Sequence, residues 1–157
     1  MTAARRSVLL AGVLVVSASA SAAAQKVFTP DELRVVERIV GTYFEAVRSL
    51  SAAQDYETAK VRLIVAREYL ARSWTFWTRH ERSDAAKMVT ATTAALDALD
   101  DRMSEVPIDP AGVQAAVQEA SARCAACHAE FRVEHPNTGT YGIKPGILGE
   151  PAGQGQP

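Results

Sequence analysis

The sequence lacks several features that would place it among nucleic-acid-binding, membrane-spanning or zinc-finger proteins. Its 17 lysine and arginine residues face 18 aspartate and glutamate residues without a long run of one sign, so no nucleic-acid surface is predicted. Its apolar run at residues 8–16 is shorter than the about 20 residues that a membrane-spanning helix needs. Only two cysteines are present, too few for a zinc site built from two cysteine pairs.

The first 24 residues have the pattern of a secretory signal. Arg5 and Arg6 precede the apolar run, and Ala22 to Ala24 form an A-x-A-type cleavage site before Gln25. We expect residues 1–24 to be removed, which takes two arginines from a chain of net charge −1 and leaves −3. The mature protein is predicted to be periplasmic, with no stable membrane span.

The central part of the chain is predicted to be entirely helical. Between residues 29 and 132, only Gly41, Pro107 and Gly112 interrupt helical patterning once Pro30 and Pro110 are counted as helix openers. The first helix follows a capping box at residues 29–32, and the second opens between residues 51 and 55 and runs to about residue 80. Ser83 or Asp84 is predicted to be the N-cap of the third helix, and Asp109 precedes the fourth.

Each predicted helix carries an apolar stripe at spacings of three and four residues. The stripes include Leu33, Val36, Val40, Tyr43, Val47 and Leu50; Tyr56, Ala59, Leu63, Ala66, Leu70 and Trp77, with Ile64 and Trp74 beside them; Met88, Thr92, Ala95, Leu99 and Met103; and Val113, Val117, Ala120, Cys124, Cys127 and Phe131. Four such helices with short connections bury their stripes most simply as an antiparallel bundle. The predicted fold class is therefore all-α, with one four-helix-bundle domain over residues 25–133.

The composition changes after residue 133. Residues 134–157 hold six of the nine glycines and four of the seven prolines, with few large apolar side chains. This composition predicts a flexible, unpacked tail.

The most informative residues are Cys124-Ala125-Ala126-Cys127-His128, a CxxCH sequence that is the attachment signature of c-type haem. On a helix, positions i, i+3 and i+4 share one face, so two thiols can add to the two porphyrin vinyl groups while the histidine reaches the iron. Cys124 and Cys127 are thus predicted to hold haem c, with His128 as the axial ligand. The same residues could instead form a disulfide or contribute to a zinc site, although no further cysteine completes one.

The segment from Cys124 to Arg132, which reads CxxCHxxFR in the last helix of four, resembles the class II c-type cytochromes, the cytochrome c prime family. The resemblance implies a four-helix bundle with one covalently attached haem on the last helix. It also implies that Cys124 and Cys127 hold the haem, that His128 binds iron and that Arg132 matches the arginine beside this histidine. A solvent-facing cation at the helix end is the ordinary alternative for Arg132.

In the resembled family, the first helix covers the second face of the haem with a methionine or an apolar residue. The first helix here has no methionine, and its candidates for that position are Val36, Ile39, Val40 and Tyr43. Other conceivable sixth ligands all have ordinary explanations as core, helix-end or tail residues; they are Met88, Met103, His80 and His135. We therefore expect a five-coordinate iron.

These observations predict an exported monohaem cytochrome that carries single electrons between periplasmic partner proteins and is not an enzyme. A first alternative is binding of NO or CO at an open iron, with Tyr43 as hydrogen-bond donor. A second is a haem-free helical interaction module with a Cys124–Cys127 disulfide. The resemblance also implies a homodimer through an exposed apolar stripe. Docking through a lysine ring is not expected, because the chain has 13 arginines and 4 lysines.

Overall fold

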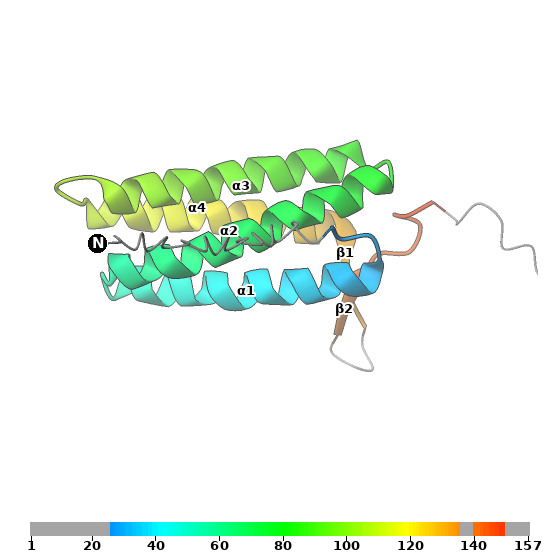
Figure 1. Ribbon diagram of the computed structural model, residues 1–157, viewed down its shortest axis with the longest axis horizontal. Coiled ribbons are helices and arrows are strands. Elements are labelled where there is room, and N and C mark those ends of the chain that lie inside the picture. The colour runs from blue at the N-terminus through cyan, green and yellow to red at the C-terminus, as the bar shows by residue number, and fades with distance from the viewer. Residues whose placement is uncertain (1–25, 136–139, 150–157) are drawn as a thin grey trace, which may run out of the picture.

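The structure, a computed structural model, describes residues 26–135 and 140–149. These residues form four helices, α1 (Pro30–Ala52), α2 (Tyr56–Arg79), α3 (Ser83–Ser104) and α4 (Pro110–Phe131), and two strands, β1 (Arg132–His135) and β2 (Thr140–Ile143). The helices run up and down alongside one another, each next to its neighbour in sequence (Figure 1). The mainly helical fold with four helices is as predicted. The predicted signal at residues 1–24 lies outside the described residues.

The helix boundaries follow from local hydrogen bonding at their first turns. The Thr29 side chain accepts from the Glu32 N–H at 3.2 Å, and Glu32 accepts in return from the Thr29 N–H at 2.9 Å, which completes the predicted capping box. The side chains of Asp55 and Asp109 cap α2 and α4 by accepting hydrogen bonds from backbone N–H groups of the first turn, without a reciprocal bond. The prediction for α3 was wrong by one residue, because its N-cap is Arg82, which makes no side-chain capping bond.

The end of the bundle where α1 joins α2 and α3 joins α4, here called the closed end, has a tightly filled core. Val47, Leu99 and Val113 are fully buried there, and the Ser51 hydroxyl lies 3.8 Å from the Met103 sulfur across the core. Tyr56 and Ala59 at the start of α2 are buried as well, so side chains from all four helices fill the core at this end.

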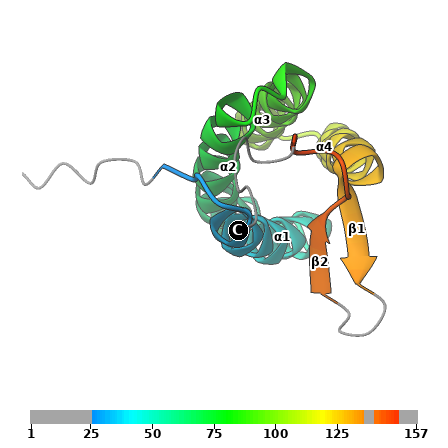
Figure 2. The ribbon, with the colours of Figure 1, turned by 90° about the vertical axis from the view of Figure 1, so that its right-hand side faces the viewer.

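The opposite end, here called the pocket end, contains the start of α1, the α2–α3 connection and the end of α4 (Figure 2). Its core is aromatic: the Phe76 and Trp77 rings meet edge to face at 5.0 Å, and Trp77 lies 5.2 Å from Phe131. Trp77 is buried as predicted. Trp74 and Ile64 were expected beside the same stripe, but they are 47% and 53% exposed. Both side chains lie on the outer face of α2.

The segment after residue 133 was expected to be unpacked, and this prediction was wrong for the part that the structure describes. Strands β1 and β2 pair antiparallel, with Arg132 opposite Ile143. Ile143, Ile147 and Leu148 then pack against the helical core. The few apolar residues among the glycines and prolines are thus enough to anchor the segment across the pocket end, and the folded unit extends beyond residue 133 (Figure 2).

Polar contacts reinforce this anchoring. The Lys144 N–H donates to the Phe131 carbonyl at 2.8 Å, and its ammonium group donates to the Ala129 carbonyl at 2.6 Å. From the α2–α3 corner, the Arg82 guanidinium donates to the Ile147 carbonyl at 2.6 Å. The C-terminal segment is therefore fixed both to α4 and to the α2–α3 connection.

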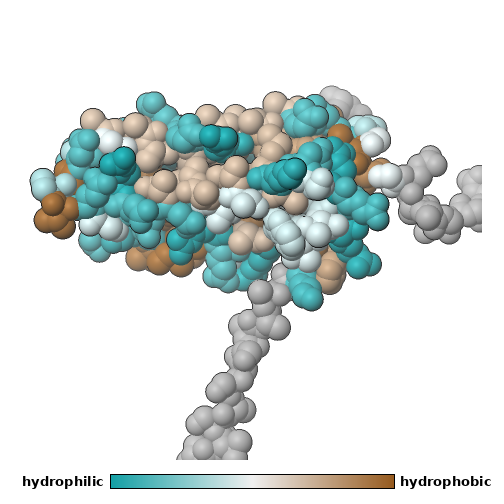
Figure 3. Space-filling view, turned by 90° about the horizontal axis from the view of Figure 1, so that it is seen from above, coloured by the Kyte–Doolittle hydropathy of each residue, from teal (hydrophilic) through white to brown (hydrophobic). Residues whose placement is uncertain are grey.

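The outer surface seen from above α3 is a mixture of hydrophilic and weakly hydrophobic residues (Figure 3). None of the helices in the described part of the chain is both long enough and apolar enough to cross a membrane.

Candidate functional site

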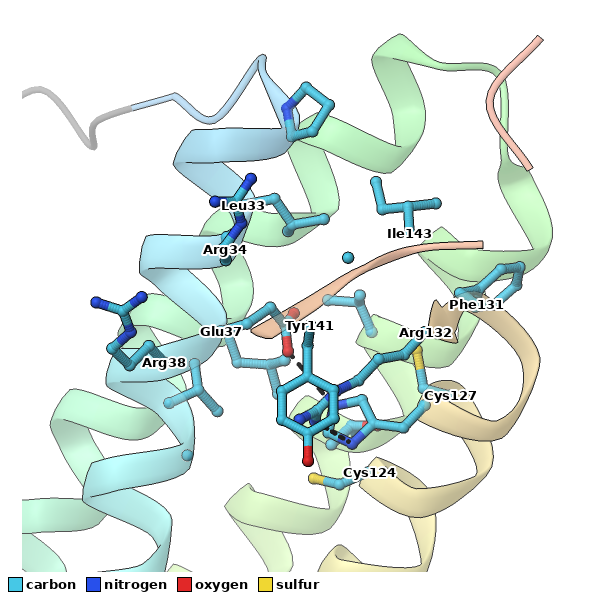
Figure 4. A pocket seen from close by; sticks show the side chains of 18 of the residues that line it. Leu33, Arg34, Glu37, Arg38, Cys124, Cys127, Phe131, Arg132, Tyr141 and Ile143 are labelled. Atoms are coloured by element: carbon cyan, nitrogen blue, oxygen red, sulfur yellow. Dashed lines mark hydrogen bonds and ion pairs between the residues drawn. The ribbon is translucent and has the colours of Figure 1, made fainter. Parts of the chain in front are cut away.

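A pocket of about 580 Å³ opens at the pocket end between α1, α4 and the hairpin, and it is large enough for a cofactor (Figure 4). Its apolar wall comes from all four helices and includes Leu33, Val40, Phe44, Leu70, Trp77, Val89 and Phe131. Its polar and charged members are Arg34, Glu37, Arg38, Thr42, Thr92, Cys124, Cys127, His128, Arg132, Thr140 and Tyr141. The pocket therefore combines an extensive apolar wall with charged groups at a few positions.

All three functional residues of the CxxCH sequence line this pocket. Cys124, Cys127 and His128 lie on consecutive turns near the end of α4, so one helix face presents two thiols and an imidazole together. Both cysteines are half-buried and are free thiols in the structure. The arrangement that the sequence spacing predicted is confirmed.

Burial controls the chemistry of the two thiols. It raises the pKa of Cys124, and it raises the pKa of Cys127 to about 12, with the nearby charge of Glu37 adding to both effects. Both groups are therefore neutral thiols at neutral pH. Because thiolates are the species that bind zinc and attack disulfides, this environment suits neither reaction well. A thioether carries no charge, so the same burial does not disfavour it.

The imidazole of His128 is contacted on both of its nitrogens. Arg132 Nη1 lies 3.1 Å from His128 Nδ1, and Glu37 Oε2 lies 3.5 Å from His128 Nε2. The guanidinium can only donate, so Nδ1 accepts and Nε2 points across the pocket toward α1. The two contacts thus fix the orientation of the ring.

Arg132 is the residue that the resemblance placed beside the histidine, and the structure brings the two together. Its guanidinium also lies 3.3 Å from the centroid of the Tyr141 ring, contributed by β2 (Figure 4). Its Nε is buried and has no hydrogen-bond partner among the described residues. Arg132 is therefore half-buried between helix and hairpin rather than a solvent-facing cation.

Of the four candidates for the position opposite His128, only one lines the described part of the pocket. Val40 lines the pocket, whereas Val36, Ile39 and Tyr43 are absent from the described residues around it. The Tyr43 ring instead lies 5.9 Å from the guanidinium of Arg62 on α2. The prediction that Tyr43 faces a ligand in this site is therefore wrong.

The conceivable sixth ligands are likewise elsewhere. Met103 is buried at the closed end, and His80 lies 3.3 Å from the Phe28 carbonyl near the α2–α3 corner. Met88 and His135 also do not appear among the described residues that line the pocket. Within the described ranges, the pocket wall has no methionine and no histidine besides His128.

Sequence reasoning missed the residues that face His128 from α1. Leu33, Glu37 and Gly41 follow one another at intervals of four along α1 and all line the pocket. The i, i+4 spacing and the only glycine of α1 were the available signals. Tyr141 and Ile143 were also missed, because they belong to the segment predicted to be unpacked.

Other ways to bind a metal find little support in this part of the chain. Among residues 26–135 and 140–149, no group of three or more histidine, cysteine, aspartate or glutamate side chains is placed to hold a metal ion. The site residues instead fit a haem, which needs two thiols, one imidazole and a wide apolar wall, and all of these meet in one pocket.

Comparisons with known proteins give no further assignment. No protein-family model, no curated protein and no solved structure matches this chain.

Proposed function

We propose that this protein is a c-type monohaem cytochrome that carries single electrons. Cys124 and Cys127 would hold one haem c through thioether bonds, formed when each S–H adds across one vinyl group. His128 would bind the iron. The observation that carries the proposal is that all three side chains of the CxxCH sequence open side by side into one apolar pocket of about 580 Å³. This arrangement agrees with the resemblance to the class II c-type cytochromes.

The bound haem would supply the redox chemistry, gaining and losing one electron at iron. In the structure, Arg132 and Glu37 contact the two nitrogens of the His128 imidazole and direct the ring into the pocket, and iron would take the place at Nε2 that Glu37 contacts here. The apolar wall reduces access of water to the site, and Arg34 and Arg38, which also line the pocket, would be available as cations for the haem carboxylates. The chain's part in this function is to bind, orient and insulate the cofactor.

The signal-like first 24 residues support export, and we propose that the electron partners are periplasmic proteins. The protein would transform no substrate. A partner that recognises a lysine ring does not fit, since only 4 lysines occur in the whole sequence.

A second candidate function is binding of NO or CO at the iron. It is favoured by the pocket wall, which, in the ranges that the structure describes, offers neither a methionine nor a second histidine as sixth ligand. Tight binding of CO to the ferrous protein supports this candidate, and exclusion of CO at high concentration argues against it. The haem-free module with a Cys124–Cys127 disulfide stays a third candidate, although both thiols are free in the structure.

The experiment is the visible spectrum of the dithionite-reduced mature protein, co-expressed with haem-attachment machinery. We expect a Soret band and a broad, merged α/β band, since no strong sixth ligand lines the pocket. His128→Ala should abolish this spectrum, whereas His80→Ala, which removes a histidine outside the pocket, should leave it unchanged. An unaltered spectrum in His128→Ala would rule out the assigned iron ligand, and a wild type without a Soret band would end the haem proposal.

A further inference from the structure

Glu37 is the charged residue of α1 that lies directly across the pocket from the CxxCH sequence. Its carboxylate oxygen Oε2 is 3.5 Å from His128 Nε2, the imidazole nitrogen that points away from α4. The two side chains are 36% and 40% exposed, so both face the open pocket rather than the packed core. Figure 4 shows Glu37 directed from α1 toward the side chains of α4.

The separation of these two atoms is close to that of two ligands on opposite sides of one metal ion. Bonds from a transition metal to imidazole nitrogen and to carboxylate oxygen are each about 2 Å long, taking zinc as the guide. Two such ligands in line are therefore about 4 Å apart. The 3.5 Å found here between His128 Nε2 and Glu37 Oε2 is about half an ångström shorter than this separation.

Besides Glu37 and the residues of the CxxCH sequence, the described part of the pocket wall offers one side chain of a type that binds haem iron, Tyr141, and its ring centroid lies 3.3 Å from the Arg132 guanidinium. This part of the wall has no methionine and no second histidine, and the α1 residues on either side of Glu37 in the same row are Leu33 and Gly41, which carry no donor atom in their side chains. The negative charge of Glu37 also reaches into the site, since it contributes to raising the pKa of both cysteines.

We propose, on the basis of the haem function above, that Glu37 is the residue opposite His128 and that its carboxylate binds the iron in the ferric state. A carboxylate is a hard, anionic ligand that stabilises the more highly charged ion. A carboxylate binds the less charged ferrous ion more weakly, so reduction of the iron by an electron-donating partner protein would favour release of Glu37. Glu37 would therefore favour the ferric state, lower the reduction potential and obstruct external ligands of ferric iron.

This role differs from that of a simple charge near the haem. A charge acts over several ångströms and depends little on the length of the side chain. A ligand must reach the metal, so shortening the side chain by one methylene removes the bond while keeping the charge. Glu37→Asp therefore separates the two roles, and Glu37→Gln removes both.

The test uses the mature haem-loaded protein and compares Glu37→Gln and Glu37→Asp with wild type. Glu45→Gln is the matched control, because Glu45 is also on α1, is exposed and pairs with Arg48 at 2.7 Å outside this pocket. The readouts are the ferric electron paramagnetic resonance spectrum, the affinity of the ferric protein for added imidazole and the reduction potential.

In both Glu37 variants we expect an altered ferric resonance spectrum and imidazole affinity at least tenfold higher than in wild type. A tenfold loss of preference for the ferric state in Glu37→Gln corresponds to a potential higher by about 59 mV. Glu45→Gln should match wild type in all three readouts.

Two outcomes would overturn the inference while the haem function stands. Wild-type behaviour of Glu37→Gln would show that the carboxylate does not reach the iron. Wild-type behaviour of Glu37→Asp alone would show that only its charge matters. Absence of covalent haem in the wild type is a different failure, because it would remove the proposed function itself.

Discussion

The two ends of the bundle are built from the same four helices but are filled in opposite ways. At the closed end, Val47, Leu99, Met103 and Val113 are at most 1% exposed and pack against one another. At the pocket end, the same helices leave a cavity of about 580 Å³ that the hairpin crosses. Packing of the core at the closed end thus stabilises the fold, while the pocket end retains a cavity.

The contrast indicates what each end is for. A cavity of this size lacks the dispersion contacts and apolar burial that a filled core supplies, so it lowers the stability of the chain by itself. The pocket end offsets part of this loss with the Phe76–Trp77–Phe131 cluster and with the anchored segment that follows β2. A bound cofactor in the pocket would supply the rest.

The strongest test of this difference between the two ends is to shorten one leucine to alanine at each end and compare the losses of stability. Leu99→Ala at the closed end should lower the free energy of unfolding by about 2–5 kcal/mol, because its neighbours are already packed around it. Leu33→Ala, at the edge of the pocket, should lower it by at least about 1 kcal/mol less, since part of the Leu33 side chain already borders empty space. Urea denaturation of the haem-free mature chain measures both values.

Equal losses in the two variants would contradict the division into a filled and an open end. Repeating the measurement on the haem-loaded protein sharpens the test. Leu33→Ala should then become more destabilising than in the haem-free chain, because its side chain would now contact the cofactor, and the effect of Leu99→Ala should not change.

A smaller effect is expected from two glycines, one at each end. A methyl group at Gly41 would meet nothing within 4 Å, so Gly41→Ala should raise the free energy of unfolding by about 0.5–1 kcal/mol through its better helix propensity. At Gly112, the methyl group would lie 2.9 Å from Asp109 Oδ2, which caps α4. Gly112→Ala should therefore bring no gain. Thermal unfolding measures the stability of both variants. An equal gain in stability from Gly41→Ala and Gly112→Ala would show that the free space around Gly41 does not matter.

The helical fold and the α4 side of the site could be predicted from the sequence, because both depend on local patterns. Capping residues and apolar spacing located all four helices to within a few residues. The CxxCH sequence placed Cys124, Cys127 and His128 on one helix face without knowledge of any other element.

The α1 side of the site could not be predicted in the same way, because it depends on the rotation of one helix against another. Val36 and Glu37 are neighbours in sequence, yet Val36 is buried in the core and Glu37 faces His128. Rotating α1 about its axis by one residue, about 100°, would change which of two neighbouring side chains faces the pocket. Only packing against the other helices fixes this rotation. Glu37 was also missed because only methionine and apolar residues of the first helix were considered for the position opposite His128.

The hairpin was missed for a different reason. Its strands are four residues long each, and the composition around them is rich in glycine and proline. Tyr141 contributes through its contact with Arg132, and Ile147 through packing on residues of distant helices. None of these long-range contacts leaves a periodic signal in the sequence.

The most direct test of the central claim is the intact mass of the mature chain, co-expressed with haem-attachment machinery and extracted to remove any haem that is not covalently bound. The account predicts the mass of the chain plus one haem for the wild type, and of the chain alone for the Cys124→Ser/Cys127→Ser variant. A wild-type chain with no added haem, or one lighter by the two hydrogens lost in a disulfide, would contradict it.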